Sequence, residues 1–397
     1  MEKNGLLATI YLPKNNYMIR LGLSILFFLF SLLVIFKAPT NLLWRATVAL
    51  TEFPHLLMIA SLLLLVSCYW AEKYKLSSSI LSSIAFIIFS STIFRTYNRA
   101  STIESELSAN FSNENYGVLK NPLQTPFSFF TLFTGLNNNT IAHKSIVYKK
   151  TNALELSLDF YSSNTNEISP CIIIIHGGSW REGDSQQLPK LNSYFANRGY
   201  NVASINYRKA PEYTNPAPIE DTRDAINYIV ENCKELKVDT SNFVLIGRSA
   251  GGQIALLSAY TLHNKNIKGV VSIYAPADMY WGAQHPGNKW VLDTDKVLGD
   301  FVGGSVKDFP EKYKQSSPVE FVDRNSTPTL IIHGQHDCMV SFLHSEHLQQ
   351  KLVANKVKNY FLDLPWATHG CDFNISGPSG QTTTYAIERF INSVLSE

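Results

Sequence analysis

Residues 243–251 read Phe-Val-Leu-Ile-Gly-Arg-Ser-Ala-Gly, an apolar run followed by a serine with a glycine two positions to either side. The apolar run predicts a buried strand, and residues 253–260 read as a helix. Glycine at both positions permits a tight turn that would expose the hydroxyl of Ser249 near the positive end of that helix. The arrangement favours a nucleophilic serine, although an ordinary glycine-rich connection has the same pattern.

A second glycine motif lies upstream. The apolar strand 171–175 is followed by residues 176–180, which read His-Gly-Gly-Ser-Trp. The backbone N–H groups of Gly177 and Gly178 are unhindered, and together with the N–H of Ala250 they could face a developing oxyanion. Such donors would stabilise the tetrahedral intermediate of acyl transfer.

An acid and a base follow in the order that this chemistry requires. Asp337 comes shortly after the apolar strand 329–332, and His369 comes after the strand 360–364. His369 could accept the proton of Ser249 and return it to the leaving group, while Asp337 would orient the imidazole. The chain order is therefore serine, aspartate, histidine.

With these motifs in place, the segment 141–397 resembles an α/β-hydrolase of the esterase and lipase branch with an HGG-type oxyanion loop. Feruloyl-esterase-like, hormone-sensitive-lipase-like, prenylcysteine-methylesterase-like and kynurenine-formamidase-like proteins have similar loops. The resemblance implies that Ser249, Asp337 and His369 lie at the carboxyl ends of neighbouring parallel strands. Ser179 departs from the pattern, because hormone-sensitive-lipase relatives usually have a third glycine there.

The alternation of strands and helices supports the same fold class independently. Ile- and Val-rich runs, including 200–205 and 269–273, alternate with helical segments, which predicts a mostly parallel sheet flanked by helices. Segments 143–149 and 154–160 read as an antiparallel leading pair. A helix begins at Pro218, and we interpret Glu220 and Asp221 as charges of its first turn.

Several titratable residues near the acid have competing interpretations. A metal site is disfavoured because the triad needs no metal, so we expect no metal or organic cofactor. His344 and His347 are expected on a helix surface, and His176 is expected to shape the oxyanion loop. The lesser candidates for the acid lie inside a strand or too close to His369 in sequence. The histidines in question are His333, His336, His344 and His347, and the lesser acids are Asp363 and Asp372.

The insertion at about 277–315 falls between strands, where this family often has a cap. It is rich in aromatic residues, and we expect it to line the acyl or alcohol pocket. Trp180, Tyr280 and Trp281 are the candidate substrate-binding residues. Cys338 and Cys371 lie in loops that should be neighbours, so a disulfide or two free thiols are both open.

The amino-terminal part has the composition of a membrane region. Three apolar segments, 21–36, 53–70 and 76–94, are each near the roughly twenty residues that cross a bilayer as a helix. We therefore predict a membrane region over 1–96 with about three transmembrane helices. A cleaved signal peptide is the alternative for the first segment, but its charged lead is long and no small-residue cleavage site follows.

The polar residues of this region say less. Lysines and arginines are nearly balanced between the two sides, so they decide the topology weakly. An odd number of spans with a cytoplasmic amino terminus would put the catalytic domain on the extracytoplasmic side. Glu52 and His55 fall near an interface, where we expect water to satisfy them.

Residues 97–140 are interpreted as a linker with polar, turn-forming stretches at 110–116 and 137–140. Between these stretches lies an aromatic cluster that could rest on the membrane, cover the catalytic mouth or pack against the hydrolase core. Its members are Phe127, Phe129, Phe130, Leu132 and Phe133.

The formal net charge is +2 and no basic tract is present, so nucleic acid is excluded as a partner. The predicted protein is a membrane-anchored serine hydrolase that cleaves a small-molecule or lipid ester through an acyl-enzyme. A peptidase or amidase with the same triad and a ligand-binding protein without catalysis are the alternatives. The identity of the ester and the oligomeric state are left open by the sequence.

Overall fold

The structure is a computed structural model that describes residues 16–71, 73–111, 121–136, 139–152, 154–165 and 167–396. Within these residues, eight strands form one sheet in the order β1-β2-β4-β3-β5-β6-β7-β8. β1 and β2 pair antiparallel, as do β2 and β4, and all later neighbours are parallel. The predicted mostly parallel sheet with an antiparallel leading pair is confirmed. The strands are β1 (Lys144–Lys150), β2 (Glu155–Tyr161), β3 (Ser169–Ile175), β4 (Asn201–Ile205), β5 (Val238–Arg248), β6 (Ile267–Ile273), β7 (Thr329–Gly334) and β8 (Asn359–Leu364).

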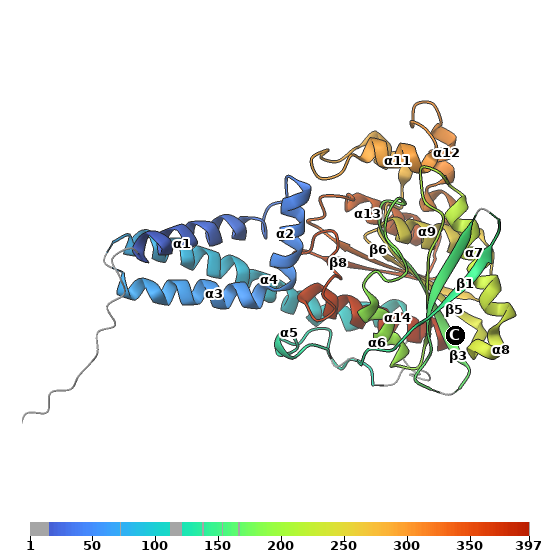
Figure 1. Ribbon diagram of the computed structural model, residues 1–397, viewed down its shortest axis with the longest axis horizontal. Coiled ribbons are helices and arrows are strands. Elements are labelled where there is room, and N and C mark those ends of the chain that lie inside the picture. The colour runs from blue at the N-terminus through green and yellow to red at the C-terminus, as the bar shows by residue number, and fades with distance from the viewer. Residues whose placement is uncertain are drawn as a thin grey trace, which may run out of the picture.

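Helices cover both faces of this sheet (Figure 1). Ile173 and Ile175 of β3 belong to the core on one face, whereas Ile172 and Ile174 belong to the core on the other. A strand that is buried on both faces is apolar throughout, which explains the unbroken isoleucine run. One face is covered by α7 (Ala217–Glu231), α9 (Ala250–Thr261) and α13 (Leu343–Ala354), and the other by α6 (Pro189–Ala196), α14 (Pro378–Ser396) and the carboxyl-terminal half of α4 (Lys75–Asn110).

The amino-terminal helices form an arm that projects from residues 141–396, the segment that resembles a hydrolase and is called the hydrolase part below (Figure 1). α1 (Asn16–Leu32) and α3 (Pro54–Ser67) both pack against the first half of α4, and η1 (Cys68–Trp70) follows α3. α2 (Asn41–Glu52) lies across the end of the arm, bent by 85° from the α3 segment. Among the described residues, α4 is long and apolar enough to span a membrane, α2 and α3 would qualify only as one bent pair, and α1 is a shorter apolar helix.

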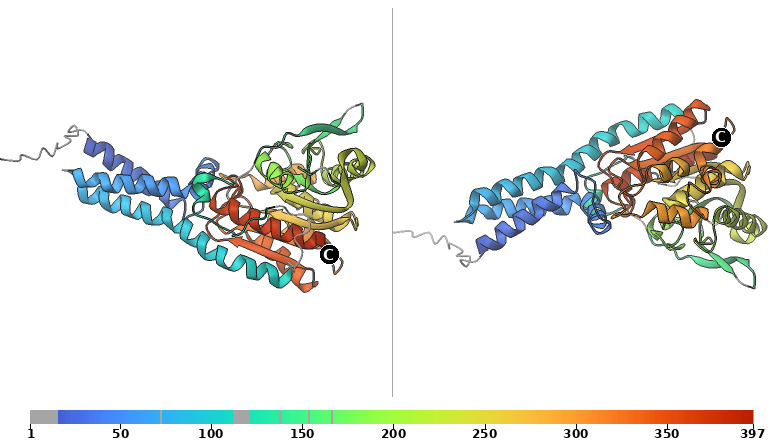
Figure 2. Two further views of the ribbon diagram at one scale, coloured as in Figure 1. Left: turned by 90° about the horizontal axis from the view of Figure 1, so that it is seen from below. Right: turned by 90° about the horizontal axis from the view of Figure 1, so that it is seen from above.

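α4 continues far beyond the arm. Figure 2 shows it running beside α14, and its second half also contacts β8. Ile103 and Leu107 are fully buried in the hydrolase core. The predicted boundary after residue 96 therefore falls inside one continuous helix, and 97–110 is part of the hydrolase layer instead of a linker. The boundary was placed by the change in composition at residue 96, although α4 continues through it without a break. The stretches predicted as polar linkers, 110–116 and 137–140, lie partly outside the described residues, at 112–116 and 137–138.

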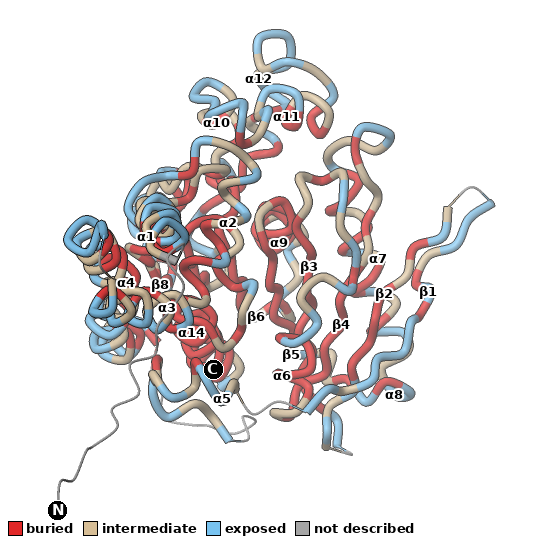
Figure 3. Tube along the Cα trace, turned by 60° about the vertical axis from the view of Figure 1, so that its left-hand side comes forward, coloured by how far each residue is buried: buried red, intermediate tan, exposed pale blue. Residues whose placement is uncertain are grey.

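The arm and the sheet differ in how their apolar residues are covered. The central strands β3, β4, β6 and β7 are buried almost throughout, whereas the arm helices carry exposed and half-buried residues around much of their surface (Figure 3). In the most apolar window of α4, 28% of the residues are buried. Where α1, α2 and α4 meet, Val34, Leu50 and Phe89 make a small core of their own.

The aromatic cluster divides between these two environments. Phe127 and Leu132 are buried, but Phe130 and Phe133 are 78% and 50% exposed. Phe133 lies in α5 (Thr131–Thr134) and contacts the ring of His55, with the ring centroids 4.8 Å apart. The cluster therefore lies at the junction of arm and hydrolase, and it packs there only in part.

Glu52 at the end of α2 is fully buried, which corrects the expectation that water satisfies it. Its Oε2 accepts a hydrogen bond from the N–H of Ser379 at 3.3 Å, in the first turn of α14. Burial raises the pKa of Glu52 to about 8. The sequence could not indicate this environment, because its partners lie more than three hundred residues away.

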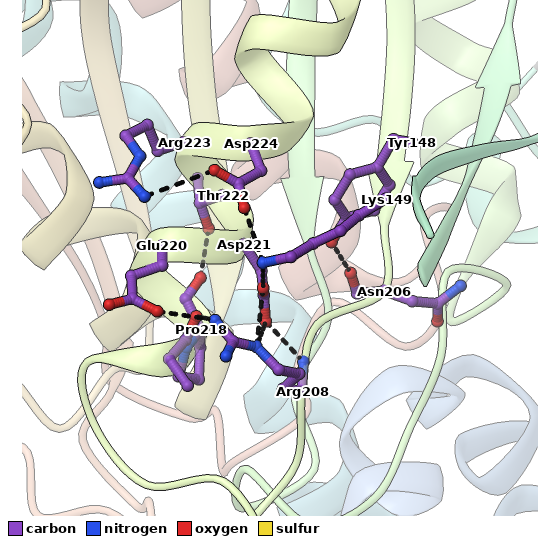
Figure 4. Close-up of polar contacts among 11 residues, drawn as sticks. Tyr148, Lys149, Asn206, Arg208, Pro218, Glu220, Asp221, Thr222, Arg223 and Asp224 are labelled. Atoms are coloured by element: carbon purple, nitrogen blue, oxygen red, sulfur yellow. Dashed lines mark hydrogen bonds and ion pairs between the residues drawn. The ribbon is translucent and has the colours of Figure 1, made fainter. Parts of the chain in front are cut away.

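Asp221 has a structural role that extends beyond the first turn of its helix. It is fully buried and accepts hydrogen bonds from Lys149 Nζ at 3.0 Å and from Arg208 Nε at 2.9 Å (Figure 4). These contacts join α7 to β1 and to the loop after β4. A buried carboxylate is retained only when donors surround it, and these two cations supply them.

The turn at Ser249 connects β5 to α9. Ser249 has φ of +51°, a left-handed conformation that strains a non-glycine residue. A Cβ on Gly247 would lie 2.1 Å from the carbonyl oxygen of Gly251, and one on Gly251 would lie 2.2 Å from that of Ile175. Both glycines are therefore required by close backbone contact.

We expect Gly247→Ala to destabilise the fold by about 2–3 kcal/mol, because backbone atoms that cannot move aside surround the added methyl group. Thermal unfolding in detergent measures this change. Gly287→Ala is the matched control, since a Cβ there meets only the Thr294 hydroxyl at 3.9 Å. Equal unfolding temperatures for the two variants would contradict the prediction.

Candidate active site

The loops after β5, β7 and β8 bring the three predicted catalytic side chains together. Ser249 Oγ lies 3.0 Å from His369 Nε2, and His369 Nδ1 lies 2.6 Å from Asp337 Oδ2. The carboxylate can only accept, so Nδ1 carries a proton and Nε2 is free to accept the hydroxyl proton of Ser249. The geometry is that of a nucleophile, a base and an orienting acid.

Asp337 is buried, and hydrogen-bond donors surround its carboxylate. The N–H groups of Met339 and Val340 donate to Oδ1 at 2.8 and 2.9 Å. His333 Nε2 lies 3.2 Å from Oδ2 and donates a second side-chain hydrogen bond. Burial alone would raise the pKa of Asp337, but the charge of His369 and the hydrogen bonds from both histidines hold it well below its usual range.

His333 is a partner of the acid that sequence reasoning did not identify. Its Nε2 also lies 3.2 Å from the carbonyl oxygen of Val340, and its Nδ1 lies 2.7 Å from Ser345 Oγ. A proton on Nε2 satisfies both acceptors there, and Nδ1 then accepts from the serine hydroxyl. The position of His333 four residues before Asp337 was the available signal, but it was read only as a possible metal ligand.

The two lesser candidates for the acid have other partners. Asp363 accepts from Arg99 Nε at 3.0 Å and from Gln335 at 2.8 Å. Asp372 is buried behind the site, where Arg248 and the hydroxyl of Tyr274 both donate to it. The Tyr274 ring in turn packs against the ring of His369, with centroids 4.4 Å apart. Asp372 therefore supports the base from behind through Tyr274 without orienting its Nδ1.

The three predicted oxyanion donors differ in whether their N–H group already donates a hydrogen bond. The N–H of Gly177 donates to Gln187 Oε1 at 2.8 Å, so it is already occupied. Within the described chain, the N–H groups of Gly178 and Ala250 have no recorded hydrogen-bond partner. Ala250 is the first residue of α9, so its N–H also carries the positive end of the helix dipole. Gln187 was missed because nothing in its neighbourhood marks it as a loop partner.

The oxyanion loop is held by local backbone geometry and by His176. Gly178, Ser179 and Trp180 all have positive φ, so Ser179 adopts at +53° the conformation that a third glycine would favour. His176 is buried, its Nδ1 lies 2.7 Å from the carbonyl oxygen of Gly177, and its ring stacks on Tyr207. Burial lowers its pKa to about 4. His176 shapes the loop, as its position before the glycine turn predicted.

A small cavity of about 40 Å³ lies beside Ser249 and Ala250. Trp180 forms part of its wall, with its ring stacked on Phe301 and its Nε1 donating to Gln253 at 2.9 Å. The insertion 277–315 supplies the opposite wall. Its helices are α10 (Met279–Gln284), α11 (Thr294–Val302) and α12 (Pro310–Gln315), followed by η2 (Pro318–Phe321), and its lining residues are Met279, Gly282, Leu292, Thr294, Val297 and Leu298.

Tyr280 and Trp281 do not line this cavity, which corrects their assignment as pocket residues. On the short helix α10 their neighbours Met279 and Gly282 face the cavity instead. Trp281 packs against His285, His344 and His347. Aromatic content indicated the correct segment, but it could not indicate which face of α10 points inward.

The predicted position of His344 on a helix surface is also wrong, because His344 is buried in the cavity wall. Its Nδ1 accepts from the N–H of Asp278 at 3.2 Å, and burial lowers its pKa to about 3. Among the described residues, no group of three or more histidines, cysteines and acidic residues is arranged to hold a metal ion. Cys338 and Cys371 are both free thiols in this structure.

The arm contacts the loops of both the acid and the base. Lys37 Nζ donates to the carbonyl oxygen of Asp337 at 2.9 Å, and Trp44 Nε1 donates to that of His369 at 2.8 Å. A Cβ on Gly370 would lie 3.6 Å from the Trp44 ring and 3.8 Å from Val48, so α2 covers the turn after the base. Sequence reasoning had no means of pairing these distant segments.

Comparison with known proteins agrees with this description. Residues 158–352 match the family model described as BD-FAE. Esterase LipC of Mycobacterium tuberculosis (strain ATCC 25618 / H37Rv) is 28% identical over 240 residues, which cover 57% of this chain and 59% of that protein. Esterase LipQ of the same strain is 29% identical over 213 residues, covering 51% of each. The chain thus spans little more than half the length of these curated relatives.

A solved structure has the same fold. The hyperthermophilic esterase from the archaeon Pyrobaculum calidifontis superposes with a TM-score of 0.54 at 22% identity, covering 66% of this chain and 88% of the other. The sheet order, the strained serine turn and the family match all lead to one assignment. Residues 158–352 match the BD-FAE family model, and they lie in a domain with the α/β-hydrolase fold that the solved esterase shares.

Proposed function

We propose that this protein is a membrane-anchored serine hydrolase that cleaves carboxylic esters through an acyl-enzyme. The observation that carries the proposal is the continuous contact from Ser249 Oγ through His369 to a buried, ionised Asp337. The likeness of the chain to proteins named esterases supports the same reaction class. Ester hydrolysis by this route needs no group beyond these side chains, the backbone donors and water.

The proposed reaction begins when His369 Nε2 takes the proton of Ser249 Oγ as that oxygen attacks the ester carbonyl carbon. The oxyanion that forms is stabilised by the N–H groups of Gly178 and Ala250, with Gly177 joining them if Gln187 moves away. His369 then gives its proton to the alcohol as the ester bond breaks. Water, activated by the same histidine, hydrolyses the acyl group from Ser249.

The role of the arm as a membrane anchor belongs to this proposal. α4 meets the length and composition of a spanning helix, and its apolar half is mostly not buried by protein. We propose that α1, α3 and the first half of α4 cross the bilayer together, which makes three passes. α1 begins at the far end of the arm from the hydrolase part (Figure 1). With the amino terminus in the cytoplasm, an odd number of passes would put the hydrolase part on the extracytoplasmic side.

Ser249→Ala should abolish labelling by a fluorophosphonate probe and lower ester hydrolysis by about 10⁴-fold or more, because no other group replaces the nucleophile. Gel fluorescence of the detergent-solubilised full chain measures the labelling, and p-nitrophenyl esters measure the rate. Ser101→Ala on the exposed face of α4 is the control. Absence of labelling in well-folded wild type would overturn the proposed function.

The cavity size predicts the chain-length profile. Because about 40 Å³ admits only a short acyl group, we expect the rate with p-nitrophenyl acetate to exceed that with the octanoate by about tenfold or more. Trp180→Ala should enlarge the cavity and reduce this ratio. A wild-type enzyme that prefers the octanoate would contradict this prediction.

Asp337→Asn should lower kcat by about 10³- to 10⁴-fold, since the neutral amide cannot stabilise the imidazolium. It should also change the acid stability. The pKa of Asp337 is depressed in the folded state, so its stabilisation is present above the unfolded pKa of about 4 and is lost as pH falls further. Unfolding temperatures between pH 6 and pH 3 should therefore fall more steeply for wild type than for Asp337→Asn.

Trp44→Phe retains the ring but removes the donor to the His369 carbonyl. We expect kcat to fall about three- to tenfold with little change in KM, since the loop that carries the base loses one fixed contact. Trp70→Phe, on an exposed residue of η1, is the control. An unchanged kcat, or a KM that rises alone, would show that Trp44 does not position the base.

A further inference from the structure

The catalytic loops lie directly at the end of the arm. Lys37, which contacts the Asp337 carbonyl, comes five residues after the last residue of α1, Leu32. Trp44, which contacts the His369 carbonyl, is in the first turn of α2. If α1 crosses a bilayer, the chain between α1 and α2 leaves it beside the acid and the base.

The cap meets the same segment of the arm. The N–H of Asn41 donates to the carbonyl oxygen of Trp290 at 2.9 Å, and Asn288 Nδ2 donates to that of Pro39 at 2.9 Å. In Figure 1 the loop that precedes α11 reaches toward α2. Leu292 and Met339, which line the cavity beside Ser249, are two residues from Trp290 and Asp337, respectively. The cavity wall on this side is therefore continuous with the contacts to the arm.

Large apolar side chains are exposed at this junction. Trp290 is 80% exposed, Leu42 is 77% exposed and Phe36 is 63% exposed. Phe130, just before α5, and Phe133, within it, are also exposed, and Figure 1 places α5 beside the same end of the arm. Aromatic residues in such a band are typical of the interface between a bilayer and water. The bend of 85° between α2 and the α3 segment would lay α2 along that interface.

From this geometry we propose that the active site works at the membrane surface and that its substrate is a short-acyl ester of a membrane-resident lipid alcohol. The inference rests on the proposed function and deepens it. The small cavity borders Ser249 and the N–H of Ala250, so the group that enters it must be short. We place the other part of the ester on the side of Leu292 and Met339, where the cavity wall meets the segments that contact the arm.

The bilayer is the occupant favoured for the exposed apolar band because the band continues the apolar surface of the arm. Leu42 and Trp290 belong to different segments that are hydrogen-bonded together through Asn41. Arg45 is exposed on the same helix, where a cation can lie among lipid headgroups. The side chains of Leu42 and Trp290 would insert at the interface and hold the mouth of the site against it.

Two isomeric lipids test the substrate class with the full chain reconstituted in phosphatidylcholine vesicles. Hexadecyl acetate has the short acyl group and the long alcohol, whereas methyl heptadecanoate reverses them. We expect hexadecyl acetate to be hydrolysed about tenfold faster or more, with a rate that depends on its mole fraction in the bilayer. Equal rates, or a preference for methyl heptadecanoate, would overturn the proposed substrate class.

Two variants test the membrane surface. The double variant Leu42→Ser, Trp290→Ser should lower hydrolysis of hexadecyl acetate in vesicles about fivefold or more, while p-nitrophenyl acetate hydrolysis stays within about twofold of wild type. Ile168→Ser, at a 72% exposed residue just before the amino end of β3, should alter neither rate. Equal loss with both esters in the double variant, or no loss with either, would overturn the proposal that Leu42 and Trp290 hold the site against the membrane surface.

The soluble ester separates the two proposals. If wild type hydrolyses p-nitrophenyl acetate but not hexadecyl acetate in vesicles, the serine hydrolase proposal stands and the lipid substrate is wrong. If wild type hydrolyses neither ester, the proposed function fails and the lipid substrate fails with it.

Discussion

A buried carboxylate is the constraint around which the catalytic edge is built. Asp337 is 1% exposed and stays ionised only because its two oxygens receive donors from four residues. Those donors fix the course of the loop after β7 and the position of the histidine after β8. His369 can then contact the nucleophile only if the strained turn after β5 holds Ser249 Oγ within hydrogen-bonding distance. One unfavourable burial thus sets the geometry of three separate loops.

The arm extends this constraint beyond the hydrolase fold. Lys37 and Trp44 hold the backbone of the acid and base loops, and Glu52 lies buried at the start of α14. None of these residues falls within the region 158–352 that matches the family model. A catalytic edge that is completed by an added helical segment can couple its geometry to the surroundings of that segment. In this chain the added segment is α2 with the loop before it, and its surroundings are the other apolar helices of the arm.

Local sequence patterns predicted the sheet and also predicted Ser249, Asp337 and His369 as the residues that the structure brings together. Such patterns succeed where the signal lies within a strand, a turn and a helix. They could not predict that Gln187 occupies the N–H of Gly177, that His333 donates to the acid, or that α10 turns Tyr280 away from the cavity. Each of these depends on contacts between distant segments. The boundary at residue 96 was wrong because composition changes there while the helix does not.

The continuity of α4 has a consequence for how the chain is made. Its second half, at residues 97–110, supplies Ile103 and Leu107 to a core that is closed by Phe390 and Ile391 of α14. The outermost layer of the hydrolase part is therefore translated before all eight strands of the sheet, and its partner α14 is translated after them. Until α14 is made, Ile103 and Leu107 lack the cover that it provides. Cutting the chain at residue 141 would leave the same surface of α14 bare, so the hydrolase part and the arm form a single folding unit.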